Sequence, residues 1–329
     1  MINRRKLVIT LGAGAVVLPL RSFAQQQTAK IPHIGYLSVG SQLSNGAFLG
    51  AFRDGLREFG YVDGKNVVID VRWAGSAAYE FPEIAASLVK TKPSAIVGTC
   101  VPSARAAKNA TTTIPVVMSL NGDPVAAGLV VSLAHPGGNV TGTTTLFEEL
   151  VPKWLELIRE AVPKARTVAV MVNPESLSDP YWWAQIEKIA GKARVKLVRA
   201  EAKTPEALES AFAAVKKQRA DALIVMSDAL WAGQAQRIVT LAGVHKLPGI
   251  YGFSEFAEAG GLMSYGISFR EYYRNVARYV AKVLKGTRPA ELPVEQPTRI
   301  EFVINRATAK KLGVNIPQQL LVRADRMIG

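Results

Sequence analysis

The strongest constraint on the fold is a repeated alternation of short apolar runs with longer amphipathic stretches. From residue 31 onward, β-branched runs are separated by stretches with helical periodicity. Alternation of this kind predicts βαβ units around a parallel sheet. The runs are continuously hydrophobic, which is typical of strands covered by helices on both faces. The first set of predicted strands is His33–Val39, Val67–Trp73, Ala95–Thr99, Pro115–Leu120 and Val140–Thr144.

The same alternation begins again after residue 145 and predicts a second lobe of the same class. A chain of 329 residues is long enough for two domains of ordinary size. We therefore predict an α/β protein with two Rossmann-like lobes, each built on a parallel sheet, joined by a hinge. The predicted strands of the second set are Thr167–Val172, Lys196–Ala200, Ala222–Met226 and Gly249–Phe253.

The C-terminal stretch is too short for a third lobe, and we expect it to complete both sheets. It holds predicted strands at Leu262–Gly266 and Arg299–Ile304, with a helix between them at Glu271–Lys285. The first lobe is then predicted to comprise residues 31–145 and 262–290, and the second residues 146–261 and 291–329. Short crossings near residues 145, 260 and 290 would act as the hinge.

The first 24 residues have the layout of a secretory signal peptide. A basic segment, Asn3–Lys6, precedes an apolar core, Leu7–Leu20, and the small residues of Ser22-Phe23-Ala24 suit a cleavage site. The apolar core is shorter than the roughly 20 residues that span a bilayer. The Arg4-Arg5 pair leaves both Sec and twin-arginine export open. We expect a periplasmic protein from which residues 1–24 are removed.

The formal charge of +14 invites a nucleic-acid interpretation, but the distribution of charge argues against it. Four of the positive charges lie in the first 24 residues, and the others are mixed with acids on predicted helix faces. The three histidines, His33, His135 and His245, lie on unrelated elements without metal-like spacing. The single cysteine, Cys100, excludes an internal disulfide framework. We expect no nucleic acid, metal or cofactor.

Polar side chains follow the predicted strands at the edge where parallel sheets bind ligands. Hydroxyls together with helix N-terminal N–H groups suit an anion, and carboxylates suit an amine. Serine and aspartate at these positions also cap helices, so a cap and a ligand contact remain alternatives for each residue. The predicted ligand-binding residues are Ser38, Ser44, Thr99, Ser103, Asp123, Asn173, Ser176, Asp228, Trp231, Ser254 and Glu255.

The sequence lacks the motifs of common catalytic sites. It contains no Gly-x-Ser-x-Gly elbow, and Gly60–Lys65 lacks the spacing of a phosphate-binding loop. Cys100 follows a predicted strand, but two-lobed racemases of acidic amino acids use two facing cysteines. We therefore expect a binding protein rather than an enzyme.

The segment Asp123–Gly142, which reads DPVAAGLVVSLAHPGGNVTG, closely resembles the signature of one family. That family is the ABC-transporter substrate-binding proteins whose characterised members are similar to receptors for tryptophan and related aromatic amino acids. The remaining segments that carry the resemblance are Phe52–Tyr61, Lys65–Val67, Leu284–Ala290, Val303–Asn305, Leu312–Val314 and Ala324–Ile328.

The resemblance implies a type I periplasmic-binding fold whose lobes close on a ligand. By position, the loops Ser38–Ser44 and Thr99–Ser103 and the residue Asp123 would line one lobe. Asn173–Ser176, Asp228 and Ser254–Glu255 would line the other. We predict a monomeric periplasmic solute receptor of an ABC import system, with a permease in the cytoplasmic membrane as its partner. An amino acid and an aromatic carboxylate are both open as the solute, and a ligand-sensing subunit of a membrane receptor is the alternative function.

Overall fold

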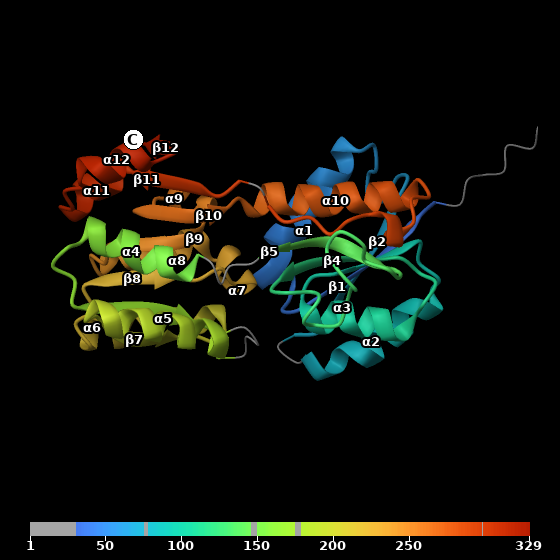
Figure 1. Ribbon diagram of the computed structural model, residues 1–329, viewed down its shortest axis with the longest axis horizontal. Helices are drawn as coiled ribbons and strands as arrows, with labels where there is room; N and C mark the ends of the chain where they lie inside the picture. Colours follow the sequence, from blue (N-terminus) through green and yellow to red (C-terminus); the bar gives the residue numbers. More distant parts are fainter. Residues whose placement is uncertain (1–30, 76–77, 146–149, 175–178, 298) are drawn as a thin grey trace, which may run out of the picture. The chain divides into compact units, whose positions relative to one another are not determined.

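The first five strands form one parallel sheet in the order β2-β1-β3-β4-β5 (Figure 1). The computed structural model describes residues 31–75, 78–145, 150–174, 179–297 and 299–329, so the predicted signal peptide lies outside the described residues. The strands are β1 (His33–Ser38), β2 (Val68–Trp73), β3 (Ala95–Gly98), β4 (Val116–Asn121) and β5 (Val140–Thr145).

Helices cover both faces of this first sheet because its strands are apolar on both sides. Helices α2 (Phe81–Lys90), which follows the short turn η1 (Ala78–Glu80), and α3 (Val101–Ala110) pack against each other, and α1 (Gln42–Glu58) packs along α10 (Phe269–Leu284). Proline residues within the first turns of α2 and α3 suit positions whose N–H groups have no partner within the helix. We call the five-stranded sheet with these helices the first lobe.

The remaining strands form a second sheet in the order β12-β11-β10-β9-β8-β6-β7. Strands β6 to β9 are mutually parallel, as predicted. Strand β10 joins them parallel to β9, but β11 is antiparallel to β10. Helix α10, which lies between β10 and β11, packs on the first lobe and does not cross back over the second sheet. The chain therefore re-enters the second sheet from the end at which β10 finishes, which makes β11 antiparallel to β10. The strands are β6 (Thr167–Val172), β7 (Lys196–Glu201), β8 (Ala222–Val225), β9 (Gly249–Phe253), β10 (Met263–Ile267), β11 (Glu301–Asn305) and β12 (Arg326–Ile328).

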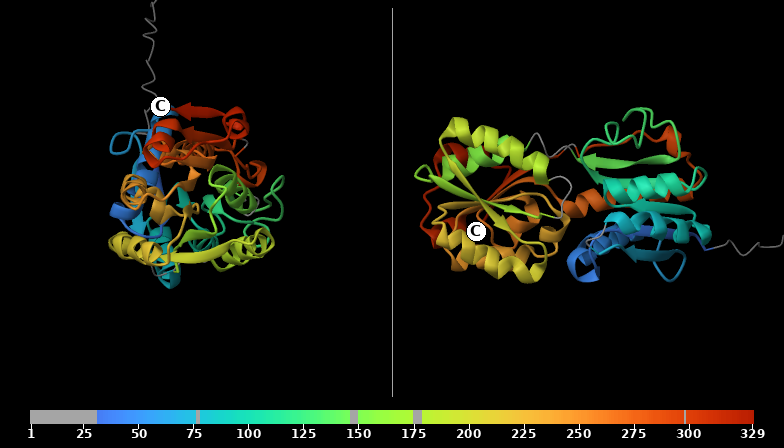
Figure 2. Two further views of the ribbon diagram at one scale, coloured as in Figure 1. Left: turned by 90° about the vertical axis from the view of Figure 1, so that its left-hand side faces the viewer. Right: turned by 90° about the horizontal axis from the view of Figure 1, so that it is seen from below.

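Helices on both faces complete the second lobe, as Figure 2 shows. Trp154 and Trp231 are among its fully buried side chains. No helix of the described residues has the length and apolar character needed to cross a membrane. The 3₁₀ turn η4 (Pro289–Glu291) packs against β5 of the first lobe. The helices and 3₁₀ turns outside the first lobe are α4 (Val151–Ala161), α5 (Asp179–Ala193), η3 (Pro205–Ala207), α6 (Leu208–Lys217), α7 (Ala229–Ala232), α8 (Ala235–Val244), α9 (Ser254–Glu258), α11 (Arg306–Leu312) and α12 (Gln318–Arg323).

Two of the predicted lobe boundaries differ from the structure. The segment 262–267, predicted for the first lobe, holds β10, which needs β9 and β11 as partners in the second sheet. The segment 291–295, predicted for the second lobe, lies along the open edge of β5. There Thr141 Oγ1 donates to Leu292 O over 2.6 Å, and Glu295 N donates to Gly142 O over 3.1 Å. The chain therefore changes lobes near Ser268 and again after Glu295, a few residues later than predicted.

Gly142, at the end of the Asp123–Gly142 segment, lies inside β5 and has a structural reason to be glycine. Its φ of +137° is one that other residues rarely adopt. A Cβ atom there would lie 2.1 Å from Met118 O in the neighbouring strand. This close approach is part of what fixes the pairing of β4 with β5.

Candidate ligand-binding edges of the two sheets

The carboxyl ends of β1 and β3 are joined by a hydrogen bond between two predicted site residues. Thr99 Oγ1 donates to Ser38 Oγ over 2.8 Å; Ser38 is buried and Thr99 is half-buried. Asn45 lies beside them in the first turn of α1 and is also buried. Its amide donates to Val39 O over 2.7 Å, while its Oδ1 has no hydrogen-bond partner within the described part of the chain. The side chain of Ser44 lies outside the described residues.

Ser103 and Asp123, also on this edge, form hydrogen bonds within their own turns. Ser103 is fully buried; its hydroxyl accepts from Cys100 N over 3.0 Å and donates to Cys100 O over 2.9 Å. This arrangement caps the first turn of α3. Asp123 is exposed, and its Oδ1 accepts from Val125 N over 2.7 Å and Ala126 N over 3.1 Å. The carboxylate of Asp123 therefore orders the turn after β4.

Three predicted residues follow β6 and β8 in the second lobe. Asn173 and Asp228 are half-buried, and Trp231 is buried in α7. Because α7 packs against α1, the loops after β1 and β8 meet, and residues of the two lobes come together there. Ser176, the fourth residue predicted for these loops, lies outside the described residues.

Ser254 and Glu255 follow β9, and the carboxylate of Glu255 is directed at the start of α10. Its Oε1 accepts from Ser268 Oγ over 2.7 Å and Arg270 N over 3.3 Å, and its Oε2 accepts from Phe269 N over 3.3 Å. Burial raises the pKa of Glu255, although these hydrogen bonds oppose the rise. The carboxylate therefore links α9 to the first turn of α10, the helix through which the chain passes from the second lobe to the first.

Aromatic side chains gather where the two lobes meet. The Phe48 ring stacks on Tyr273 at 4.8 Å between centroids and meets Phe269 and Phe253 edge-on at 5.2 and 6.4 Å. Phe48 belongs to α1 of the first lobe, whereas Phe253 ends β9 of the second. The sequence analysis missed this cluster. Phe48, Phe269 and Tyr273 lie in α1 and α10, and an aromatic residue in a helical pattern usually indicates a position in the hydrophobic core.

Two further tryptophans, Trp182 and Trp183, lie in α5 of the second lobe and do not belong to this cluster. Trp182 is buried in α5, and Trp183 lies under the guanidinium of Arg199, 4.5 Å from its ring centroid. Among the described residues, no group of three or more His, Cys, Asp or Glu side chains has the arrangement of a metal site.

The two sheets, with the chain crossing between them, define the type I periplasmic-binding fold. Residues 41–328 match the model of the family described as "ABC transporter substrate binding protein", and the chain belongs to that family.

Relatives of known name agree with this assignment. The chain is similar to a "Tyrosine-binding protein" of Clostridioides difficile strain R20291, with 31% identity over 79% of this chain and 75% of the relative. It is also similar to the crystal structure of a conserved domain protein from Vibrio cholerae, with 30% identity and a TM-score of 0.75 over 91% of this chain and 100% of the other. An ABC domain in complex with L-Trp from Streptococcus pneumonia gives 28% identity and a TM-score of 0.73 over 90% and 99% of the two chains.

Proposed function

We propose that this chain is an exported receptor that captures an aromatic amino acid between its two lobes and presents it to an ABC permease. The observation that carries the proposal is the aromatic cluster around Phe48, in which a ring from α1, the helix after β1, meets the ring at the end of β9. Relatives named for tyrosine binding or solved with L-Trp support the choice of solute, since they align with most of this chain.

The polar groups at the two edges divide the recognition of an amino acid between the lobes. In the first lobe, Thr99 and the N–H groups at the start of the helices after the strands suit the α-carboxylate. In the second lobe, the Asp228 carboxylate suits the α-ammonium group. A solute that contacts both lobes binds the closed arrangement better than the open one, and so shifts the population toward closure. The closed form is the state that a permease would recognise.

Capture requires no chemical step, and the proposal includes none. The thiol of Cys100 is the side chain at these edges that most resembles a nucleophile. Burial raises its pKa, so the thiol stays protonated at neutral pH and is poorly nucleophilic. We further propose that residues 1–24 direct export to the periplasm, that the mature protein is a monomer, and that its membrane partner is the permease.

A thermal-shift panel on residues 25–329 tests the class of solute. L-tryptophan and L-tyrosine are compared with indole and tyramine, which lack the carboxylate, and with L-leucine, which lacks the ring. A ligand at a hundred times its dissociation constant adds about 2.7 kcal/mol of stability, which is several degrees of melting temperature for a chain of this size. We expect a shift with the aromatic amino acids alone. An equal shift with L-leucine would contradict the aromatic specificity, and no shift with any amino acid would contradict the solute class.

A further inference from the structure

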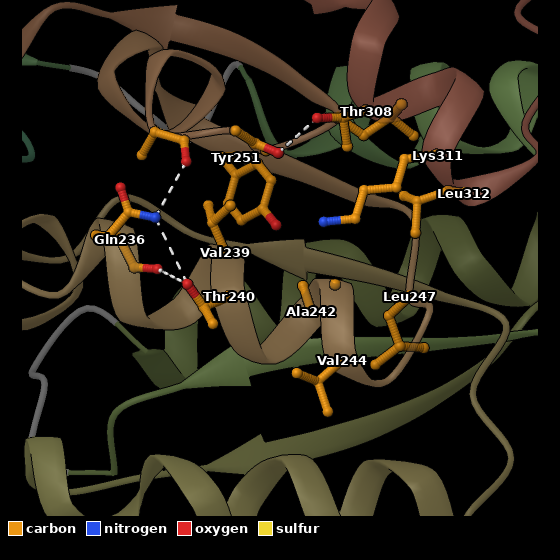
Figure 3. Close-up of a pocket in the computed structure, with 15 residues that line it drawn as sticks. Gln236, Val239, Thr240, Ala242, Val244, Leu247, Tyr251, Thr308, Lys311 and Leu312 are labelled. Atoms are coloured by element: carbon orange, nitrogen blue, oxygen red, sulfur yellow. Dashed lines mark hydrogen bonds between the residues drawn. The ribbon is translucent and has the colours of Figure 1, made fainter.

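A cavity of about 460 Å³ lies in the second lobe, at the opposite end of the strands from the predicted solute site. Its walls are α8, the turn at residues 259–262 that leads into β10, one face of α11, and the side chain of Tyr251 from β9 (Figure 3). Leu247, just before β9, also lines it, whereas Ser254 and Glu255 follow the other end of that strand. This volume is within the usual range for sites that bind small organic ligands.

Tyr251 brings a buried hydroxyl to this cavity. The residue is 1% exposed, and its ring stacks on Phe256 at 4.9 Å between centroids. Among the described residues its hydroxyl has no hydrogen-bond partner, although buried tyrosines usually have one. Figure 3 shows the hydroxyl pointing into the cavity. Burial raises the pKa of Tyr251, so the phenol stays protonated and is a hydrogen-bond donor.

Lys311 supplies the charge of the cavity. It extends from α11 with its ammonium group directed toward the Tyr251 hydroxyl (Figure 3). No acidic side chain lines the cavity, and no ion pair of Lys311 occurs among the described residues. The other polar side chains form hydrogen bonds with backbone carbonyl groups at the rim of the cavity. Thr308 Oγ1 donates to Gly260 O over 2.8 Å, and the Gln236 amide donates to Ala259 O over 3.3 Å. Thr240 Oγ1 donates to Gln236 O over 2.8 Å, and the rest of the lining is apolar or glycine.

The geometry points to a second ligand site, here called the Tyr251–Lys311 cavity, that binds a small monocarboxylate with an apolar body. The carboxylate accepts a hydrogen bond from the Tyr251 hydroxyl and pairs with the Lys311 ammonium group. Val239, Leu262 and Leu312 then surround the apolar part. A free amino acid fits poorly because its ammonium group would meet Lys311 and find no carboxylate. A sugar fits poorly because the remaining polar side chains already hold the rim.

Calorimetric titration of residues 25–329 with hexanoate tests this site, with hexanamide as the uncharged probe. A ligand of this size is expected to bind with a dissociation constant on the order of 1 mM. Lys311→Met should raise that constant about fivefold, and Tyr251→Phe about threefold. Lys310 is the neighbouring residue on the same helix, and its side chain does not line the cavity. Lys310→Met therefore removes the same charge and should leave hexanoate binding unchanged.

A filling variant tests the location without removing a polar group. A Cβ atom at Gly243, which lines the cavity from α8, meets no atom within 4 Å, so Gly243→Leu is expected to fold and to abolish hexanoate binding. Asp228→Asn, at the other end of the strands, should bind hexanoate as the parent protein does. Two results would overturn the site: no saturable heat with hexanoate, or the same affinity in Lys311→Met as in Lys310→Met. Equal binding of hexanamide would overturn the assignment of a carboxylate.

Discussion

Replacing Glu255 with alanine is expected to weaken the connection by which α10 leaves the second lobe. The side chain is 6% exposed. Its carboxylate accepts hydrogen bonds from the Ser268 hydroxyl and from the N–H groups of Phe269 and Arg270, at the first turn of α10. Alanine supplies no acceptor, so these donors lose their partner in a region that water reaches poorly.

The magnitude follows from two opposing effects. Leaving buried donors unsatisfied costs about 1–3 kcal/mol, and hydrogen bonds to a charged acceptor lie at the upper end of that range. The raised pKa of Glu255 shows that burial already penalises the charged carboxylate, and the substitution relieves that penalty. We therefore expect a net loss of about 2 kcal/mol, or about 5 °C in melting temperature.

Urea unfolding of Glu255→Ala and of Glu258→Ala measures the effect against a matched control. Glu258 lies on the same helix and pairs with Arg270 and Arg326 at the surface, so its loss should cost about 0–1 kcal/mol. Equal losses in the two variants, or a Glu255→Ala protein as stable as the parent, would refute the assigned role of Glu255.

Three further predictions follow from the same contacts. Because burial raises the pKa of Glu255, the folded protein holds that proton to higher pH than the unfolded chain does. Its contribution to stability is therefore present below the ordinary carboxyl pKa of about 4.3 and is lost as pH rises through the folded value. Glu255→Gln should flatten this part of the stability curve, and parallel curves for the two proteins would contradict the assignment. Gly142→Ala should cost at least about 3 kcal/mol in urea unfolding, because its Cβ would meet Met118 O, whereas Gly138→Ala, in open space, should be nearly neutral. Ser103→Ala should cost about 1 kcal/mol through loss of the α3 cap, and unchanged thermal stability would contradict that role.

Much of the fold could be predicted because buried parallel strands are continuous apolar runs. The predicted bounds of β6 and β9 coincide with those in the structure. A strand was predicted at Arg299–Ile304, where β11 lies, but its antiparallel direction and the three-residue β12 were beyond sequence reasoning, because they depend on the lobe against which α10 packs. The boundary expected at residue 262 was wrong for the same reason: a five-residue strand has no local signal for the sheet it joins.

The residues of the candidate site could also be predicted only in part. Residues at the carboxyl ends of strands, such as Ser38 and Thr99, could be located because the ends of parallel strands share one edge. Asn45 and Phe48 could not, since the direction of a helical side chain depends on how α1 meets α10 and α7. The Tyr251–Lys311 cavity was also beyond reach. It brings together residues from β9, α8 and α11 that have no common pattern in the sequence.

The most direct test of the central claim is calorimetric titration of residues 25–329 with L-tryptophan and L-tyrosine, alongside Asp228→Asn and Asp54→Asn. Asp54 is an exposed carboxylate on α1 that pairs with Arg57, so its substitution makes the same change in charge away from the strand ends. Binding between the lobes predicts one solute per chain, a loss of about tenfold or more in Asp228→Asn, and unchanged affinity in Asp54→Asn. Saturable binding that is equal in both variants would place the solute elsewhere, and no heat with either amino acid would contradict the proposed receptor.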